Sequence, residues 1–397
     1  MDTNTEYRKA WQRFRSNKPA HLSLYVILFA LMIACFGYIL APDGSPDANE
    51  QLPALALQPA GKMVQVLEIP ISRNEAPPSW FSCLLSGKPL AFRAIPIEAG
   101  SLVLRADSVY FRGFGAYSRP QSLHLVQLYA VTPDSVRNKG DTFFFQDAEK
   151  KLRFLQRSAL VQQFDAAPPL SLRRFPLGTD KYGRCMLSRL ILGFRVSLLV
   201  GSIAVLISLT VGLCIGAIGG YFRGRVDDVV MLLINTVWSI PTLLLVFAVV
   251  LALGRGISII FLAVGLTMWV DVARVVRGQV MALRDLPFVE AARTMGFSGR
   301  RILFRHIVPN LLGPVMVLAA GNFATAILLE SGLSYLGFGV QPPTPSWGSM
   351  LNENYGYAIG GKPLLALAPA LVIALTVLAF NLVGNGLRDA LDVRNVE

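Results

Sequence analysis

Uncharged apolar stretches of membrane-spanning length dominate the sequence and limit what the chain can fold into. The four longest run from Val196 to Gly220, Val229 to Leu253, Leu311 to Leu329 and Leu364 to Leu387. Each approaches or exceeds the ~20 residues with which a helix crosses the hydrocarbon of a bilayer. Charged residues make up only 16% of the chain, whereas soluble domains average about 25%. The pattern therefore predicts an all-α polytopic membrane protein.

Two weaker stretches bring the predicted number of transmembrane helices to six. The first, Leu22 to Ala41, could instead be a signal peptide, but its apolar core is longer than ~7 to 15 residues and no small-x-small cleavage site follows closely. The other, Ile257 to Val270, is too short alone, so its helix must include Asp271 and Arg274. Three-residue spacing places these two on neighbouring helix positions, where we expect a structural ion pair.

Basic residues collect at the ends of these spans, which predicts an orientation by the positive-inside rule. Before the first span stand Arg8, Lys9, Arg13, Arg15 and Lys18. The N-terminus is therefore expected in the cytoplasm. The predicted parts are a cytoplasmic segment (1–21), the first helix (22–41), an extracytoplasmic segment (42–190), a five-helix core (191–390) and a cytoplasmic tail (391–397). The net charge of +12 follows from this distribution, so we expect no nucleic-acid partner.

The extracytoplasmic segment 42–190 has a different composition from the core. It contains prolines, charges of both signs and short runs rich in Val, Ile, Leu and aromatic residues. Runs of this kind between turn residues predict strands at Lys62–Ile71, Leu102–Phe111 and Thr142–Phe145, and Leu123–Val131 alternates similarly. We expect a small β-rich domain inserted between helices one and two.

A loop at 285–309, between spans four and five, is neither apolar enough to insert nor composed like a flexible linker. Pro287 suits the first turn of a helix, and Glu290 near that end complements the helix dipole. Ala291 and Ala292 form helix well and let another protein approach closely, and Gly296 can end the helix. The loop is predicted to be a short docking helix at the membrane surface.

These residues resemble a known motif. The order Glu290-Ala291-Ala292, Gly296, Ile307 and Pro309 is similar to the EAA loop in permease subunits of ATP-binding-cassette (ABC) importers, in the oligopeptide, dipeptide and nickel branch. A solvated basic loop would explain the arginines here but not this spacing. The resemblance implies that these six residues form the coupling helix and its flank, which insert into a cleft of an ATPase subunit.

Two further stretches resemble the same branch. The segment before span two contains Thr179, Asp180, Gly183 and Arg184, although Cys185 stands where an aspartate is usual. The segment after span five contains Gln341, Pro342, Trp347 and Gly348 and is similar to the second, C-type permease subunit. The resemblance covers 175–392 well, 8–41 loosely and almost none of 42–172, so the insertion is particular to this chain.

The resemblance implies a type I ABC importer permease fold in the inner membrane of a bacterium. It also implies a heterodimer with a homologous permease subunit, two ABC ATPase domains and an extracytoplasmic substrate-binding protein. The cargo would be a peptide, with nickel chelates, glutathione and other solutes as alternatives. The sequence has no Gly-x-x-x-x-Gly-Lys-Ser/Thr loop, so ATP and Mg are expected on the partner ATPase. This chain would be a pore subunit rather than an enzyme, and would bind no cofactor.

Two other classes of function were weighed against a pore subunit. A membrane-anchored extracytoplasmic binding or assembly factor would need no coupling loop, and a membrane-embedded hydrolase would need a polar cluster within the spans. Only Glu330, Asp271 and Arg274 lie there, too few for such a cluster. Glu330 is either a substrate-path or gating residue or a structural polar contact. The insertion is expected to dock the binding protein or the second permease.

Several smaller features lead to local expectations. Gly212, Gly216 and Gly220 form a stripe for close helix packing, within the subunit or at an interface. Pro241 and Pro314 should bend their helices. Cys83 and Cys185 are both placed outside, where a disulfide is permitted, although sequence separation gives no distance. The three histidines lie far apart, so no metal site is expected.

Overall fold

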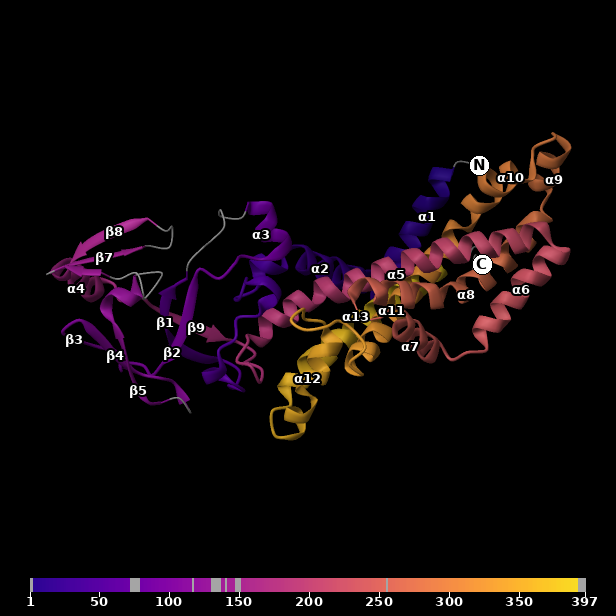
Figure 1. Cartoon of the computed structure of the whole chain (residues 1–397). Helices are drawn as coiled ribbons and strands as arrows, with labels where there is room; N and C mark the ends of the chain where they lie inside the picture. Colours follow the sequence, from indigo (N-terminus) through magenta and orange to yellow (C-terminus); the bar gives the residue numbers. More distant parts are fainter. Residues whose placement is uncertain are drawn as a thin grey trace. The chain divides into compact units, whose positions relative to one another are not determined.

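The computed structural model describes residues 3–71, 79–115, 118–129, 137–139, 141–146, 151–254 and 256–391. The chain divides into two compact units, whose elements are labelled in Figure 1. The first, helical unit comprises residues 1–35, 193–353 and 366–397. The second unit comprises residues 36–192 and 354–365, and every strand among the described residues lies in it.

Helices build the first unit, and several of them have the length and hydropathy of membrane spans. They are α1 (Thr3–Ser16), α2 (Lys18–Leu40), α5 (Met186–Phe222), α6 (Gly224–Trp238), α7 (Thr242–Leu253), α8 (Ile257–Arg284), α9 (Pro287–Thr294), α10 (Gly299–Ile302), α11 (Leu312–Tyr335), α12 (Trp347–Ile359) and α13 (Leu364–Leu391). Among the described residues five helical segments could cross a membrane, and a sixth if α6 and α7 form one span. The ends of α2, α5, α12 and α13 that lie beyond the unit's limits belong to the second unit.

The predicted third span is not one straight helix. Instead of a continuous helix over Val229–Leu253, α6 and α7 meet at a bend of 89°. Pro241 is the residue before α7 and has an extended ψ of 127°. Because proline has no N–H and excludes an α-helical residue before it, the helix must stop and restart here. The bend expected at Pro241 is therefore confirmed, and it is a break.

The glycine stripe of α5 packs against the backbone of α8 within the first unit. A Cβ on Gly212 would lie 2.7 Å from the Trp269 carbonyl oxygen, and one on Gly216 would lie 2.4 Å from that of Ala273. Gly220 meets the carbonyl of Arg277 in the same way, at 2.6 Å. Internal packing, one of the two expected uses of the stripe, is confirmed.

Helical structure before α11 begins earlier than predicted. The chain is helical from Gly299, not from Asn310, and it passes through a π turn at Leu303–Ile307 and a 3₁₀ turn at Val308–Leu311. Pro309 lacks the N–H that would continue the α-helical ladder, so the turns around it are irregular. Pro314 falls in the first turn of α11, a position that proline tolerates, and the bend expected there stays a prediction.

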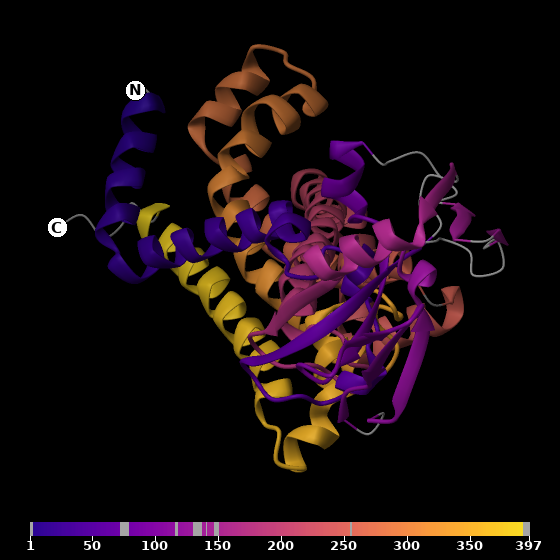
Figure 2. The ribbon, with the colours of Figure 1, turned by 90° about the vertical axis from the view of Figure 1, so that its left-hand side faces the viewer.

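The N-terminal helices pack on the C-terminal helix. Phe14, Ala20 and Ile27 share a buried cluster with Ala379 and Val383 of α13. Figure 2 shows the indigo α2 crossing the yellow α13. The N-terminal helices and α13 are therefore packed together inside the first unit.

The described residues of the second unit form three small antiparallel sheets, each with three strands, in the orders β2-β1-β9, β3-β4-β5 and β6-β7-β8. The strands are β1 (Lys62–Pro70), β2 (Phe92–Ile97), β3 (Val103–Arg105), β4 (Ser108–Arg112), β5 (Pro120–His124), β6 (Arg137–Lys139), β7 (Thr142–Gln146), β8 (Leu152–Gln156) and β9 (Leu170–Phe175), with helices α3 (Trp80–Ser86) and α4 (Arg157–Ala166). One core joins the sheets to α4, with Leu67, Ile97, Phe111, Phe143 and Leu160 all buried.

The strand predictions were confirmed in two places and modified in two. Lys62–Ile71 and Thr142–Phe145 became β1 and β7. Leu102–Phe111 is a hairpin rather than one strand, because the chain turns at Ala106, where φ is +52°. Leu123–Val131 leaves β5 at His124 and becomes a 3₁₀ turn over Leu125–Leu128, and residues 130 and 131 lie outside the described residues.

Candidate functional site

Helix α9 is the predicted docking helix, and one of its faces is fixed to the first unit. Val289 and Ala292 are buried in a cluster with residues of α5, α8 and the segment before α11, among them Tyr221, Val276 and Ile307. Glu290 and Ala291 are exposed. One face of α9 is thus packed on the first unit, and the opposite face is exposed.

The end of α9 is a glycine cap. Gly296 has a φ of +76°, which a glycine adopts without steric cost. Its N–H donates to the Arg293 carbonyl at 2.9 Å, and the next N–H, of Phe297, donates to the Ala292 carbonyl at 3.2 Å. This pair of bonds is the Schellman motif. The prediction that Gly296 ends the helix is confirmed.

Arginines attach the loop to the neighbouring helices. Arg223, before α6, donates to Asp285 at 2.6 Å, and Arg284 donates to the Tyr221 carbonyl. Arg277 of α8 holds Asp227 of α6 with two hydrogen bonds, of which Nη2 to Oδ2 is 2.6 Å. The sequence indicated only an orientation from these arginines, because their acidic partners lie about fifty residues away or more along the chain.

The two remaining motif residues of the loop lie in the irregular turns before α11. Ile307 is fully buried beside Val289, whereas Pro309 is exposed. Nearby, the His306 ring stacks on Phe297 at 5.8 Å, and the Arg301 guanidinium lies 4.0 Å from the same ring centre. The chain after α9 is therefore held against the helices by packing rather than left as a free loop.

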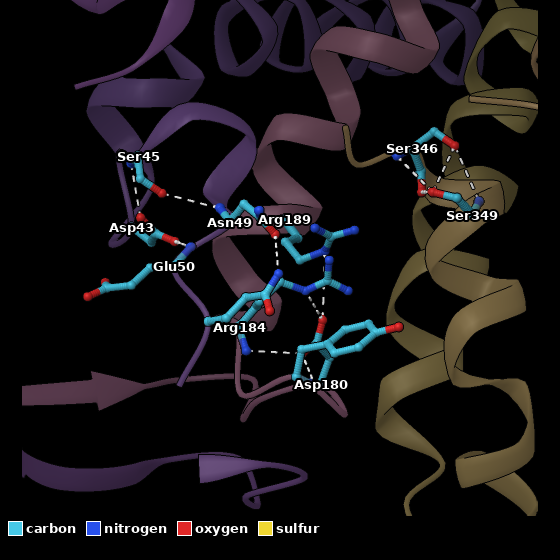
Figure 3. A network of polar contacts seen from close by, with 11 residues as sticks. Asp43, Ser45, Asn49, Glu50, Asp180, Arg184, Arg189, Ser346 and Ser349 are labelled. Atoms are coloured by element: carbon cyan, nitrogen blue, oxygen red, sulfur yellow. Dashed lines mark hydrogen bonds and ion pairs between the residues drawn. The ribbon is translucent and has the colours of Figure 1, made fainter. Parts of the chain in front are cut away.

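The motif before α5 is a buried hydrogen-bond network of the second unit. The Asp180 carboxylate accepts from the Arg184 backbone at 3.0 Å and from its Nε at 2.6 Å, and Arg189 Nε lies 3.9 Å away. Figure 3 shows both arginines turned toward Asp180. The Thr179 hydroxyl donates to the Leu55 carbonyl and accepts from the Gln58 N–H. All four side chains are at most 2% exposed.

Gly183 completes this network because only glycine fits. Its φ is +75°, and a Cβ there would lie 1.8 Å from the Leu52 carbonyl oxygen. The structure therefore brings together the predicted residues Thr179, Asp180, Gly183 and Arg184, and it buries them against residues 52–58. They hold the two ends of the insertion together.

The motif after α11 packs inside the first unit. Trp347 is fully buried, with its ring 4.8 Å from Phe194 and against Gly193 of α5. A Cβ on Gly348 would lie 2.5 Å from the Ser331 carbonyl oxygen. Gln341 donates to the Gly339 carbonyl at 2.9 Å, and Pro342 precedes Pro343 across a cis peptide bond. These contacts hold the segment before α12 on α5 and α11. Helix α12 itself was not predicted from the sequence.

Glu330 is fully buried among serine hydroxyls. Its carboxylate accepts from Ser334 at 2.8 Å and from Ser197 of α5 at 3.3 Å. Ser346 bonds Ser334 at 3.3 Å and Ser349 at 3.2 Å. Figure 3 shows Ser346 and Ser349 side by side. The sequence did not reveal these serines, although Ser334 stands four residues after Glu330 on one helix face.

The ion pair expected between Asp271 and Arg274 was wrong. No ion pair joins these two within the part of the chain that the structure describes. Arg274 lies 3.9 Å over the Trp238 ring and reaches Asn235 at 3.4 Å. The guanidinium is thus drawn to the end of α6, where a ring face attracts a cation.

The disulfide considered for Cys83 and Cys185 is not formed, and both thiols are free. Cys185 is buried in an apolar cluster with Leu52, Leu55 and Phe175, whereas Cys83 lies on α3, half-buried. Burial raises the pKa of the Cys185 thiol, so it acts as a small core residue.

The geometry defines a protein with several helices of membrane-spanning length and one short helix, α9, that packs on them by one face and exposes the other. Residues 212–396 match the family described as Binding-protein-dependent transport system inner membrane component. Residues 5–59 match the N-terminal TM domain of oligopeptide transport permease C. The two matches together lie on either side of most of the insertion.

Curated relatives agree with this match. The oligopeptide transport system permease protein OppC of Haemophilus influenzae is 42% identical over 58% of this chain and 73% of its own length. The glutathione transport system permease protein GsiD of Pectobacterium atrosepticum is 41% identical over 54% and 71%. The dipeptide permease DppC of Bacillus subtilis is 39% identical over 59% and 72%.

A solved structure of the MetNI methionine ABC transporter is similar to 52% of this chain and 98% of its own, with 19% identity and a TM-score of 0.43. The extent and identity of the curated matches define a transport permease rather than an enzyme. The chain belongs to the family of binding-protein-dependent transport system inner membrane components. It is a multi-pass permease subunit of an ABC importer.

Proposed function

We propose that this chain carries short peptides inward across the bacterial membrane as the C-type subunit of a heterodimeric pore. The observation that supports this most strongly is its relation to permeases named for oligopeptides, dipeptides and glutathione, itself a tripeptide. In this arrangement the N-terminus and α9 face the cytoplasm, and the strand-rich second unit faces the outside, as the positive-inside rule predicts. A substrate-binding protein delivers the peptide from that side.

Coupling to ATP proceeds through α9. Two ABC ATPase domains bind ATP and Mg, and one of them receives the exposed face of α9, which carries Phe288, Glu290 and Ala291. Because Val289 and Ala292 are packed on α5 and α8, a displacement of α9 moves those helices with it. The arginine contacts to Asp285 and Tyr221 stiffen the same connection. Such a rigid link suits alternating access between two packed arrangements.

Photo-cross-linking tests the position of α9. A photoreactive phenylalanine at Phe288, 40% exposed, should form an adduct with the ATPase subunit in the assembled transporter. The matched control is the same probe at Tyr110, 43% exposed in the second unit, which should give no ATPase adduct. An adduct from Tyr110 but none from Phe288 would place the ATPase on the wrong side and reject the proposal.

Gly296 tests the coupling itself. Replacing Gly296 with leucine forces a side chain into a left-handed conformation, at a cost of about 1 to 2 kcal/mol, and should disturb the angle at which the chain leaves α9. We expect normal membrane insertion but a large loss of ATP-driven uptake of a radiolabelled tripeptide. Gly296→Asn, which tolerates this conformation better, should retain most uptake. Equal, normal uptake by both variants would contradict a coupling role.

A further inference from the structure

Helix α3 of the second unit contains no charged residue and exposes an apolar face. Trp80 is 71% exposed, Phe81 61% and Leu85 46%. With 3.6 residues per turn, these three side chains project from one side of the helix. Ser82 and Cys83, on the opposite side, are partly buried. The helix therefore packs on the second unit by its more polar side and turns its aromatic side outward.

Both ends of α3 are fixed by local hydrogen bonds. The Ser79 side chain accepts from the Ser82 N–H at 3.2 Å, which is a helix N-cap. At the other end the Gly87 N–H donates to the Cys83 carbonyl at 3.1 Å, and Gly87 has a φ of +82°, which a glycine adopts without steric cost. These bonds make α3 a defined element that holds its aromatic side chains in one direction.

The C-terminal end of α3 packs on the last turn of α2. A Cβ on Gly87 would lie 2.8 Å from Cε1 of Tyr38 and 2.9 Å from the Gly44 carbonyl oxygen. The Lys88 N–H donates to the same carbonyl at 2.8 Å. All of these residues belong to the second unit, and Figure 1 shows α3 beside the end of α2. The position of α3 is thus set by the residues at which α2 ends.

The end of α2 indicates where the membrane surface lies. With 23 residues, α2 is about 35 Å long, enough to cross ~30 Å of hydrocarbon. Phe36, Ile39 and Leu40 in its last two turns are exposed, as lipid-facing side chains are. The Tyr38 hydroxyl accepts from the Asp47 N–H at 3.4 Å, and tyrosines with an apolar ring and a polar tip are enriched at membrane surfaces. Helix α3 therefore lies at the level of the lipid headgroups.

The exposed face of α3 suits a lipid surface better than a protein. Its two aromatic side chains offer at most roughly 500 Å², and Leu85 adds less, whereas each side of a stable protein interface buries about 800 Å². A bilayer has no such minimum, because binding increases with each apolar side chain that enters it. Lys88 follows α3 and is exposed, and a lysine at this level can extend its ammonium toward headgroup phosphates.

We propose that α3 is an interfacial anchor, which lies on the phospholipid bilayer at the C-terminal end of α2. Trp80, Phe81 and Leu85 insert between the lipids, and Lys88 meets the phosphates. In the proposed orientation this is the outer leaflet, but the anchor requires only that α2 spans the bilayer. The insertion is then held at the membrane by α3 as well as by the two helices that flank it.

Photo-cross-linking in intact cells that produce the whole transporter tests this contact. Benzoylphenylalanine at Phe81 should form an adduct that raises the mass of the chain by one phospholipid. The matched control is the same probe at Phe154 of β8, which is 72% exposed and lies at the opposite end of the second unit from α3 in Figure 1. Phe154 should give no phospholipid adduct.

Three results of this cross-linking would overturn the proposal. They are no adduct from Phe81, equal phospholipid adducts from Phe81 and Phe154, and an adduct of Phe81 with a protein in place of a lipid. In the last case the face would dock the binding protein or the second permease subunit.

Trp80 provides a second test, with the purified full chain in phosphatidylglycerol nanodiscs. The chain has five tryptophans, so the fluorescence of Trp80 is obtained as the difference between the parent and Trp80→Leu. We expect lipids brominated near the headgroup to quench this difference more strongly than lipids brominated near the chain ends, because an interfacial ring lies close to the headgroups. Stronger quenching by the deep bromines, or none by either lipid, would contradict an interfacial anchor.

Neither measurement depends on transport, which separates the anchor from the proposed function. If the transporter imports peptides while Phe81 and Trp80 contact no lipid, the anchor fails and the proposed function stands. If both contact lipid but the transporter imports no peptide, the proposed function fails instead.

Discussion

Hydroxyl groups from three parts of the chain surround the Glu330 carboxylate, at Ser197, Ser334 and Ser346. Glu330→Gln keeps the volume and one acceptor, so we expect thermal stability in detergent close to that of the parent. Glu330→Leu leaves buried hydroxyls without an acceptor and should lose about 1 to 3 kcal/mol. Uptake decides between the two roles considered for Glu330: normal uptake by the stable Gln variant indicates a structural contact, and lost uptake indicates a gate.

Asp180 has a sharper expected effect, since it faces two buried arginines. Asp180→Ala removes a carboxylate that accepts from Arg184 and lies 3.9 Å from Arg189 Nε, and breaking such a pair costs about 3 to 5 kcal/mol. Denaturation monitored by circular dichroism should show this loss. Asp165→Ala, at an exposed aspartate of α4, should change stability little, and a similar loss there would contradict the role of the buried pair.

At the scale of helices, α5 and α8 can pack closely because glycines on α5 have no side chain at the contact. Gly216→Ala would place a Cβ 2.4 Å from the Ala273 carbonyl oxygen, so the helices must move apart and the protein should unfold at a lower temperature. The matched control is Gly278→Ala on α8, where a Cβ would meet nothing within 4 Å and alanine favours the helix. Equal melting temperatures for both variants would refute this packing.

Hydropathy predicted the long apolar helices well. It predicted less well the places where a helix begins or changes its geometry, because individual residue contacts determine these. The stretch Val196–Gly220 became α5, but α5 begins ten residues earlier, at Met186. Hydropathy could not predict this start, because the first turn contains Arg189, which is buried 3.9 Å from Asp180. The π turn at Leu303–Ile307 has no apolar signature and follows from Pro309. Helix α12 is polar at Asn352, Glu353 and Asn354, so no apolar period separates it from a loop.

At the scale of the whole chain, the sequence predicted helix α9 and its glycine cap because both depend on residues close together in the chain. The motif residues Thr179, Asp180, Gly183 and Arg184 were also identified, but not what they touch, since residues 52–58 lie more than a hundred positions away. The position of α3 at the end of α2 was not predicted for the same reason. It depends on Gly87 and Tyr38, which lie far apart in the chain, and no spacing in the sequence connects them.

Excision of the insertion is a prediction for the whole molecule. Lys62 and Phe175 are paired across β1 and β9, and the Gly61 N–H donates to the Phe175 carbonyl at 2.9 Å. Paired residues lie about 5 Å apart, so a two-residue turn should replace residues 63–174 without strain. We expect the shortened chain to insert into membranes and to assemble with the ATPase.

Uptake by the shortened transporter then tests the role expected of the insertion. Reduced uptake with intact assembly would support docking of the binding protein, whereas unchanged uptake and unchanged assembly would reject any docking role. A deletion of the same length across residues 193–304 should abolish assembly, because it removes α9 together with the parts of α5 and α8 on which it packs.

The pairing of β1 with β9 has an evolutionary consequence. Because the first and last strands of the domain are hydrogen-bonded neighbours, the chain enters and leaves the domain at nearly the same place. A single recombination event can therefore insert such a domain into a permease or delete it. Neither change alters the order or the orientation of the transmembrane helices. Related permeases should therefore differ most in length and sequence between these two strands. A new binding surface can arise there without any change in the proposed contact between α9 and the ATPase.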